Sequence, residues 1–380
     1  MDITITPGIL KGDIHVIPSK SQAHRLLICA AFADKSTQLH CPETNRDIEA
    51  TAACLRALGA SVQRTESGYI VDPIARTPQC AVLPCGESGS TLRFMLPVAG
   101  ALGIDATFIL EGRLPHRPLS PLWEEMERMG CKLHKDGNAL HCSGKLRQGQ
   151  YRMDGSVSSQ FISGLMFAHW LMGDCTLTIS SEPESRPYID LTEHALSLFK
   201  DHHSPGYVRV EGDWSNGAFW LAAQFLGNPL SVLGLDDTSA QGDRIVVDLL
   251  RALKDNNAVI DAKNIPDLVP VLSVFAAANH GATFTNIARL RLKESDRVQS
   301  TIAMLKSLGG QATADDNALT VLPCRFTGGT VDACNDHRIA MSAAIAATIS
   351  HAPVTILGAE CVQKSYPTFW QEFGRLGGKI

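Results

Sequence analysis

The chain has 380 residues, of which 44% are hydrophobic and 19% charged, and its formal net charge is −5. These values are typical of a globular protein and exclude a disordered chain, and the acidic balance without a basic stripe argues against a nucleic-acid binder. We expect a cytoplasmic protein without membrane contact, because no basic-then-apolar leader opens the chain and no apolar run reaches the roughly 18 residues of a membrane span.

The cysteines predict no metal site. Their number, 11, is odd, and no two are spaced Cys-x-x-Cys. The nearest pair, Cys80 and Cys85, lacks the second pair that would complete a zinc tetrahedron. We therefore expect buried, reduced thiols.

Six similar segments recur at intervals of about 55 to 70 residues, which indicates one supersecondary unit used repeatedly. Each is an amphipathic run that predicts a helix. Four of the runs stop at a glycine, the residue that adopts the left-handed conformation of a helix end without a steric clash. The predicted helix ends are Gly59, Gly130, Phe199, Leu253, Gly309 and Gly377.

Three of these helix ends are followed by two short alternating runs with a polar turn between them, the pattern of a hairpin. The runs cover residues 60–63 with 69–72, 132–134 with 139–142, and 311–313 with 318–322. By contrast, only 14 residues separate Phe199 from Asp213 and Leu253 from Asp267. Residues 200–212 and 254–266 should therefore lack a complete hairpin.

Basic residues gather at the beginnings of predicted helices, although the backbone there already carries partial positive charge. Small hydroxyl residues and glycine accompany them, so the combination predicts binding of phosphate or carboxylate groups. For any single helix the alternative is an ordinary cap with a surface base. These helix starts hold Lys20, Ser21 and Arg25; Gly89 and Arg93; Ser158, Ser159 and Gln160; and Arg338.

Further cations lie in predicted loops, and two acids stand among them. A ligand with several negative charges would suit so many bases. Asp267 and Glu294 are candidates for a general base that removes a hydroxyl proton, and for Asp267 the alternative is a helix N-cap. The loop cations are Arg113, Arg117, Lys293, Arg297 and Lys364. No nucleotide-binding glycine motif and no Gly-x-Ser-x-Gly elbow is present.

These segments, in this order, closely resemble the enolpyruvyl transferases, and within that family its shikimate branch. Each motif alone is weak, but ten in sequence order are specific, and they span nearly the whole chain. The matching segments are 18–21 with Arg25, 86–93, Arg113 with 117–118, 158–160, 185–188, 241–243, 266–267, 293–297, 335–338 and 364–367.

The resemblance implies an α/β (α+β) fold, a two-domain inverse α/β barrel built from six βαβαββ units, two of them shortened. One domain, residues 19–228, would hold shikimate 3-phosphate. The other, residues 1–18 with 229–380, would hold phosphoenolpyruvate and the catalytic groups. Helix starts from both domains are expected to face one cleft, and we expect a monomer.

The resemblance also implies the activity: transfer of the enolpyruvyl group of phosphoenolpyruvate to the 5-hydroxyl of shikimate 3-phosphate, a step towards chorismate and the aromatic amino acids. The family needs no metal or organic cofactor. Shikimate 3-phosphate would be held by Ser21, Arg25, Ser158, Ser159, Gln160, Ser185, Asp267 and Lys293. Phosphoenolpyruvate would be held by Lys20, Gly89, Arg113, Gln160, Arg297, Arg338 and Lys364, and Arg93 and Tyr188 complete the substrate site. Asp267 would accept the hydroxyl proton, while Glu294, Lys364 and Lys20 would act at the methylene carbon.

The sequence departs from the family pattern at one position, and two alternative functions are open. Glu87 stands where many members have Asn, and an ionised Glu cannot donate a hydrogen bond to an anion. Pairing with Arg93 or Arg113 would offset its charge. The alternatives are a transferase that uses UDP-N-acetylglucosamine, which shares the fold and chemistry, and a non-catalytic anion-binding relative. Lys20, Asp267, Glu294, Arg338 and Lys364 together argue against the second.

Overall fold

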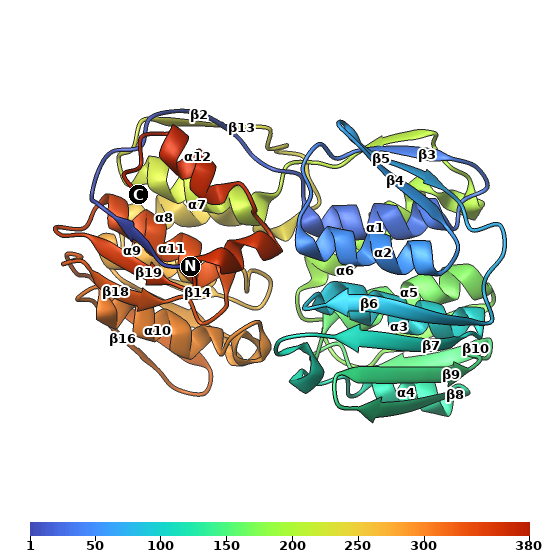
Figure 1. The fold of residues 1–380 in the computed structure, drawn as a ribbon. Coiled ribbons are helices and arrows are strands. Elements are labelled where there is room, and N and C mark those ends of the chain that lie inside the picture. Colours follow the sequence, from blue (N-terminus) through green and yellow to red (C-terminus); the bar gives the residue numbers. More distant parts are fainter. The chain divides into compact units, whose positions relative to one another are not determined.

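The computed structural model describes all residues, 1–380, and divides them into two compact units. The continuous unit is Pro18–Glu211, and the split unit joins Met1–Ile17 to Gly212–Ile380. Both chain ends lie in the split unit (Figure 1). Each unit combines helices with mixed sheets, which confirms the expected α/β class.

The boundary between the units lies earlier than the sequence suggested. The chain leaves the continuous unit after Glu211, whereas we expected this crossing near residues 227–229. The reason is helix α7 (Trp214–Phe225), whose Phe219 and Trp220 are completely buried in the core of the split unit.

The continuous unit contains three repeats, of which the second and third begin with strand, helix, strand, helix, whereas the first begins at helix α1 because the preceding strand, β2, belongs to the split unit. In the second repeat β6 pairs with β7 in parallel, and the antiparallel hairpin of β8 and β9 completes a four-stranded sheet. The first sheet has the same plan, but its parallel edge strand, β12, comes from the end of the unit. The elements are α1 (Lys20–Ala31), β3 (Thr37–His40), α2 (Arg46–Ala57), β4 (Ser61–Thr65), β5 (Gly68–Asp72), β6 (Cys80–Gly86), α3 (Gly89–Leu102), β7 (Asp105–Leu110), η1 (Leu114–His116), α4 (Leu122–Arg128), β8 (Cys131–Asp136), β9 (Ala139–Gly144), β10 (Gly149–Met153), α5 (Ser159–Met172), β11 (Cys175–Ile179), α6 (Arg186–Leu198), η2 (Lys200–His202) and β12 (Tyr207–Arg209).

The split unit repeats the plan around β14, β15, β17 and β16. The N-terminal strand β1 pairs with β19, near the end of the chain, and β2 pairs with β13. The first residues of the chain therefore complete two sheets of the split unit. Besides α7, the elements are β1 (Ile3–Ile5), β2 (Gly12–His15), β13 (Leu230–Leu233), η3 (Gly242–Ile245), α8 (Val246–Asp255), β14 (Ala258–Asp261), α9 (Val269–Ala278), β15 (Ala282–Thr285), η4 (Ala288–Leu292), α10 (Arg297–Ser307), β16 (Gln311–Ala314), β17 (Ala318–Leu322), β18 (Gly329–Asp332), α11 (His337–Thr348), β19 (Val354–Leu357), η5 (Ala359–Lys364) and α12 (Phe369–Arg375).

The repeat pattern read from the sequence is confirmed. Strand pairs form at all three expected hairpins, β4–β5, β8–β9 and β16–β17. The two short gaps hold one strand each, β12 and β14, and each of these belongs to the sheet of another repeat. The third and fourth repeats therefore keep only the two-stranded sheets β10–β11 and β2–β13.

Helices in the middle of each unit are buried, which fits their almost entirely apolar sequences. All twelve residues of α11 and twelve of α3 are buried. In the continuous unit α1 and α2 lie under the sheet of β3, β5 and β4 (Figure 1), and α3 packs on α5. None of the helices combines the length and apolar character that crossing a bilayer requires. This packing fixes the helix beginnings, where the candidate residues lie.

Candidate active site

In the split unit the Asp267 carboxylate is surrounded by three cations. Its Oδ1 lies 2.8 Å from Nη1 of Arg297 and 3.8 Å from Nζ of Lys293, and its Oδ2 lies 3.3 Å from Nη2 of Arg338. The N-cap of α9 is Leu268, which makes no side-chain capping bond. Asp267 is therefore not that helix's N-cap residue, and its carboxylate is committed to ion pairs.

Arg297 is the centre of this cluster and is almost fully buried. Its Nε and Nη2 donate to the two oxygens of Asp336 at 3.0 and 3.2 Å, and Nη2 also lies 2.6 Å from Glu294. Asp336 is itself buried and accepts a further hydrogen bond from Ser295. Such bidentate pairing fixes a guanidinium in one orientation, so Arg297 presents a rigid face toward Asp267 and Glu294.

Arg338 is held at the start of α11. Asp336 caps that helix by accepting from the Arg338 backbone N–H, and Arg338 Nη1 donates to the carbonyl of Ser215 at 2.9 Å. The Ser215 hydroxyl donates to Asp243, a buried acid. The Arg338 side chain thus connects the α7 and η3 segments to Asp267.

The electrostatics of this cluster are strongly coupled. Burial acts to raise the pKa of the Asp267 carboxyl, but the charges of Arg338, Lys293 and Arg297 together hold it well below its usual range. Burial lowers the pKa of Lys293 to about 8, against the pull of Asp267. Burial and the negative charge of Asp267 raise the pKa of Asp243 to about 7. An anion bound here would therefore change the protonation of its neighbours.

Lys364 is distant from these residues along the chain but lies in the same unit. It ends η5, it is 6% exposed, and its Nζ donates to the carbonyl of Asn335 at 2.9 Å. Asn335 immediately precedes the Asp336 that holds Arg297. The contact places the Lys364 ammonium beside the loop that opens α11.

In the continuous unit, Lys20 is the first residue of α1 and pairs with Asp47 of α2 at 2.9 Å. Arg25, one turn further on, is buried. It donates to Thr192 and to the carbonyl of Tyr188, both at 2.8 Å, and to the carbonyl of Ser21. Burial lowers the pKa of Arg25 to about 10.

The beginnings of α3 and α5 meet through side chains. Arg93 Nη1 donates to Gln160 Oε1 at 2.8 Å, and Gln160 Nε2 donates to Ser90 at 2.9 Å. A Cβ built on Gly89 would lie 2.6 Å from Nη1 of Arg117 and 2.7 Å from Nη1 of Arg93. The missing side chain therefore lets two guanidinium groups approach the first turn of α3.

Hydroxyl residues complete these helix starts. Ser158 caps α5 by accepting from the Gln160 backbone N–H, and Ser159 is the buried first residue of that helix. Ser185 precedes α6 with a φ of 54°, makes no capping bond and is buried. The first turns of α1, α3 and α5 contain no acidic residue. Their backbone N–H groups therefore favour an anion.

Two arginines of the loop after β7 lie in different surroundings. Arg113 is exposed, and its side chain makes no hydrogen bond or ion pair, whereas the Arg117 guanidinium lies beside Gly89. The Glu87 carboxylate lies over the backbone of Gly112, 2.5 Å from a Cβ built there. The Glu87 carboxylate therefore lies close to the backbone just before Arg113.

Within each unit, the expected residues form connected groups, apart from Arg113. The structure gives Arg117, named above only as a loop cation, a place beside Gly89, and it adds residues that the sequence did not single out: Asp47, Thr192, Ser215, Asp243 and Asp336. Arg117, Asp243 and Asp336 lay within motifs already recognised, so position in those motifs was the available signal. No group of three or more His, Cys, Asp and Glu side chains is arranged to hold a metal ion.

Comparison with known proteins identifies one matching family. Residues 5–373 match the family model of EPSP synthase (3-phosphoshikimate 1-carboxyvinyltransferase). The chain is 36% identical to the 3-phosphoshikimate 1-carboxyvinyltransferase of Clostridium kluyveri over 419 residues, and 36% identical to that of Clostridium acetobutylicum over 418 residues. Each comparison covers 100% of this chain and 98% of the relative.

Solved structures show a similar fold. EPSP synthase from Acinetobacter baumannii superposes with a TM-score of 0.78 at 23% identity, covering 99% of this chain and 98% of that one. The enolpyruvyl transferase NikO from Streptomyces tendae gives a TM-score of 0.77 at 16% identity, covering 99% and 97%.

Proposed function

The chain belongs to the EPSP synthase family, the 3-phosphoshikimate 1-carboxyvinyltransferases, and from this premise we propose how its own residues carry out the reaction. The enzyme transfers the enolpyruvyl group of phosphoenolpyruvate to the 5-hydroxyl of shikimate 3-phosphate and releases phosphate. The product feeds the synthesis of chorismate and the aromatic amino acids.

The observation that carries the proposal is the position of Asp267 among Arg297, Arg338 and Lys293. The hydroxyl that the general base deprotonates must lie next to the carbon that it attacks. The base must therefore lie close to the groups that bind phosphoenolpyruvate. The three cations bind the anion, and the mostly buried carboxylate that they surround is the base. Arg297 and Arg338 bind phosphoenolpyruvate, while Asp267 and Lys293 face the 5-hydroxyl.

The low pKa of Asp267 means that substrate binding must precede proton removal. While Arg338, Lys293 and Arg297 are its only partners, the carboxylate is a weak base. An arriving phosphate or carboxylate shares these cations and weakens their hold on Asp267, so its pKa rises towards the range useful for proton transfer. Substrate binding thereby activates the base, and a proton is not removed before the electrophile is present.

Glu294 acts at the methylene carbon. Its carboxyl group, whose Oε2 lies 2.6 Å from Arg297 Nη2, acts in its acid form: it gives its proton to the methylene carbon while the 5-oxygen bonds to the adjacent carbon and Asp267 takes the hydroxyl proton. A tetrahedral ketal phosphate results. The Glu294 carboxylate then takes a proton back from the same carbon, phosphate departs with the electron pair of its C–O bond, and the double bond is regenerated. Lys364, with Lys20, assists Glu294 in the proton transfers at the methylene carbon.

The continuous unit binds the phosphorylated shikimate ring. Ser158, Ser159 and Ser185 offer hydroxyl and backbone donors, and Gln160 orients Arg93. Ser21, Arg25 and Tyr188 lie in the adjoining network at the start of α1. Gly89 leaves space for the phosphoenolpyruvate anion among Arg93, Arg117 and Lys20, with Arg113 closing over it from the same loop. We expect the enzyme to act as a monomer.

The test is an assay of phosphate release from phosphoenolpyruvate in the presence of shikimate 3-phosphate or of UDP-N-acetylglucosamine. The proposal expects turnover only with shikimate 3-phosphate and an enolpyruvyl ether as product. Turnover with the nucleotide sugar would favour the other branch of the enolpyruvyl transferases. If calorimetry detects binding of shikimate 3-phosphate but the assay detects no turnover, the result would favour a non-catalytic anion-binding relative. Light scattering at the mass of one chain, 41.0 kDa, tests the monomer.

A further inference from the structure

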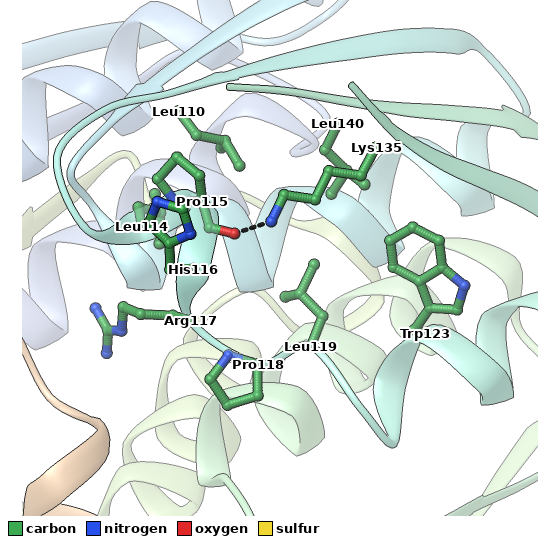
Figure 2. Close-up of a pocket in the computed structure, with 10 residues that line it drawn as sticks. All are labelled: Leu110, Leu114, Pro115, His116, Arg117, Pro118, Leu119, Trp123, Lys135 and Leu140. Carbon is green, nitrogen blue, oxygen red and sulfur yellow. Dashed lines mark hydrogen bonds between the residues drawn. The ribbon is translucent and has the colours of Figure 1, made fainter. Parts of the chain in front are cut away.

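The continuous unit contains a cavity that none of the proposed catalytic groups uses. Its volume is about 270 Å³, close to the lower limit of roughly 300 Å³ for small-molecule pockets. The wall is formed by the end of β7, by η1 and the residues after it, and by α4, β8 and β9. Figure 2 shows the lining side chains.

The lining combines an apolar slot with one cation. Leu110, Leu119 and Leu140 surround the cavity, and the Trp123 indole forms one wall. The Lys135 side chain crosses it, and its ammonium donates to the carbonyl of Pro115 (Figure 2). An ammonium has three N–H donors, so two remain for a ligand.

This chemistry selects a class of ligand. A flat aromatic ring packs well against an indole and leucine side chains. A carboxylate would take up the donors of Lys135 in a charge-assisted hydrogen bond, the strong kind. A neutral ligand would lack this charge-assisted hydrogen bond, and the exposed Lys135 side chain would keep its contact with water instead.

The cavity is joined to the proposed substrate site by a short stretch of chain. Arg117 belongs to the lining, but its guanidinium points away from the cavity (Figure 2). That guanidinium reaches the first turn of α3, where it lies 2.6 Å from the position of a Cβ on Gly89. Any shift of the segment from Pro115 to Leu119 therefore moves Arg117 relative to Gly89.

We propose that this cavity is a regulatory site for a small aromatic monocarboxylate, which packs its ring between Trp123 and Leu119, binds Lys135, and alters phosphoenolpyruvate binding through Arg117. The binding step stands without the proposed function, and only the effect on kinetics rests on it. Shikimate 3-phosphate binding should respond less, because Arg25 and Ser159 do not line the cavity.

The experiment uses the full chain and 3-phenylpropanoate as probe, with the neutral 3-phenylpropanamide as its matched control. Calorimetric titration is done on the unaltered protein, on Lys135→Met, and on Lys132→Met, which removes a lysine of the same strand that is also exposed but does not line the cavity. We expect saturable binding of the acid, about tenfold weaker binding to Lys135→Met, as for loss of a charged hydrogen bond, and unchanged binding to Lys132→Met. Leu119→Trp, which fills the slot, should abolish binding.

Kinetics then test the coupling. Saturating 3-phenylpropanoate should change KM for phosphoenolpyruvate in the unaltered enzyme and in Lys132→Met, and have no effect in Lys135→Met. Absence of binding at millimolar probe, or equal affinity for acid and amide, would overturn the site. Binding that leaves KM for phosphoenolpyruvate unchanged would overturn its regulatory role. Binding is measured without turnover, so failure of the proposed function would be seen separately.

Discussion

Asp336 accepts hydrogen bonds from two nitrogens of Arg297, at 3.0 and 3.2 Å, although 39 residues separate them in the chain. The acid is completely buried and the guanidinium nearly so. Burial raises the cost of leaving either charge alone, so the pair depends on both partners. The same carboxylate caps α11 through the backbone of Arg338, and it therefore orients both arginines that face Asp267.

Asp336→Asn should damage this cluster without removing bulk. The amide cannot balance the buried charge of Arg297, so the free energy of unfolding should fall by about 3–5 kcal/mol, the usual cost of breaking a buried pair. Urea unfolding measures this loss. Asp316→Asn, an exposed residue of the β16–β17 turn, is the control and should unfold like the unaltered chain. A loss below about 1 kcal/mol would mean that Asp336 is not needed to hold Arg297.

Gly89→Ala should alter phosphoenolpyruvate binding more than folding. The added methyl group would lie within 3 Å of Arg117 and Arg93, whose flexible ends can move away without disturbing the helix. We expect KM for phosphoenolpyruvate to rise about tenfold, as for loss of one charged hydrogen bond, with KM for shikimate 3-phosphate nearly constant. In Gly374→Ala, where a Cβ meets nothing within 4 Å, both constants should stay as they are.

Asp243→Asn should change how stability depends on pH. The pKa of Asp243 in the folded chain, about 7, exceeds its ordinary value of 3.8. A raised pKa means that the carboxyl favours folding fully only below pH ~4, and that this stability is lost as pH rises through about 7. An amide has no charge to bury, so the variant should gain stability above pH 7 relative to the parent, by at most about 4 kcal/mol for three pKa units.

Thermal unfolding at pH 5 and pH 8 checks this prediction, with Asp255→Asn on the exposed end of α8 as control. The difference between Asp243→Asn and the parent should be larger at pH 8. An equal difference at both values would show that Asp243 is not titrating near neutrality.

Local patterns predicted much of the fold. Gly59, Gly130, Gly309 and Gly377 all have positive φ, from 87° to 117°, because glycine is the residue that tolerates this backbone. Alternating side chains marked the hairpins, since strands bury every second residue. The crossing at Glu211 was missed because no local signal shows which of two cores will bury the α7 helix.

The site was predictable residue by residue only where a helix start or a motif marked it. Pairings between distant segments could not be predicted, because Asp336 and Arg297 meet through tertiary packing. Within one loop, Arg113 and Arg117 are both basic and only four positions apart. Which of the two reaches Gly89 depends on the direction of the chain after η1, and the sequence carries no local signal for that.

Asp267→Asn tests the central claim most directly, because it keeps the shape and one acceptor of Asp267 but removes the base. The turnover number is measured with shikimate 3-phosphate and phosphoenolpyruvate both saturating, and calorimetry confirms that each still binds. We expect turnover to fall by roughly 10²-fold or more, the usual scale of general base catalysis, while shikimate 3-phosphate affinity changes far less. A near-normal turnover number in this variant would contradict the account and leave Glu294 as the leading candidate for the base.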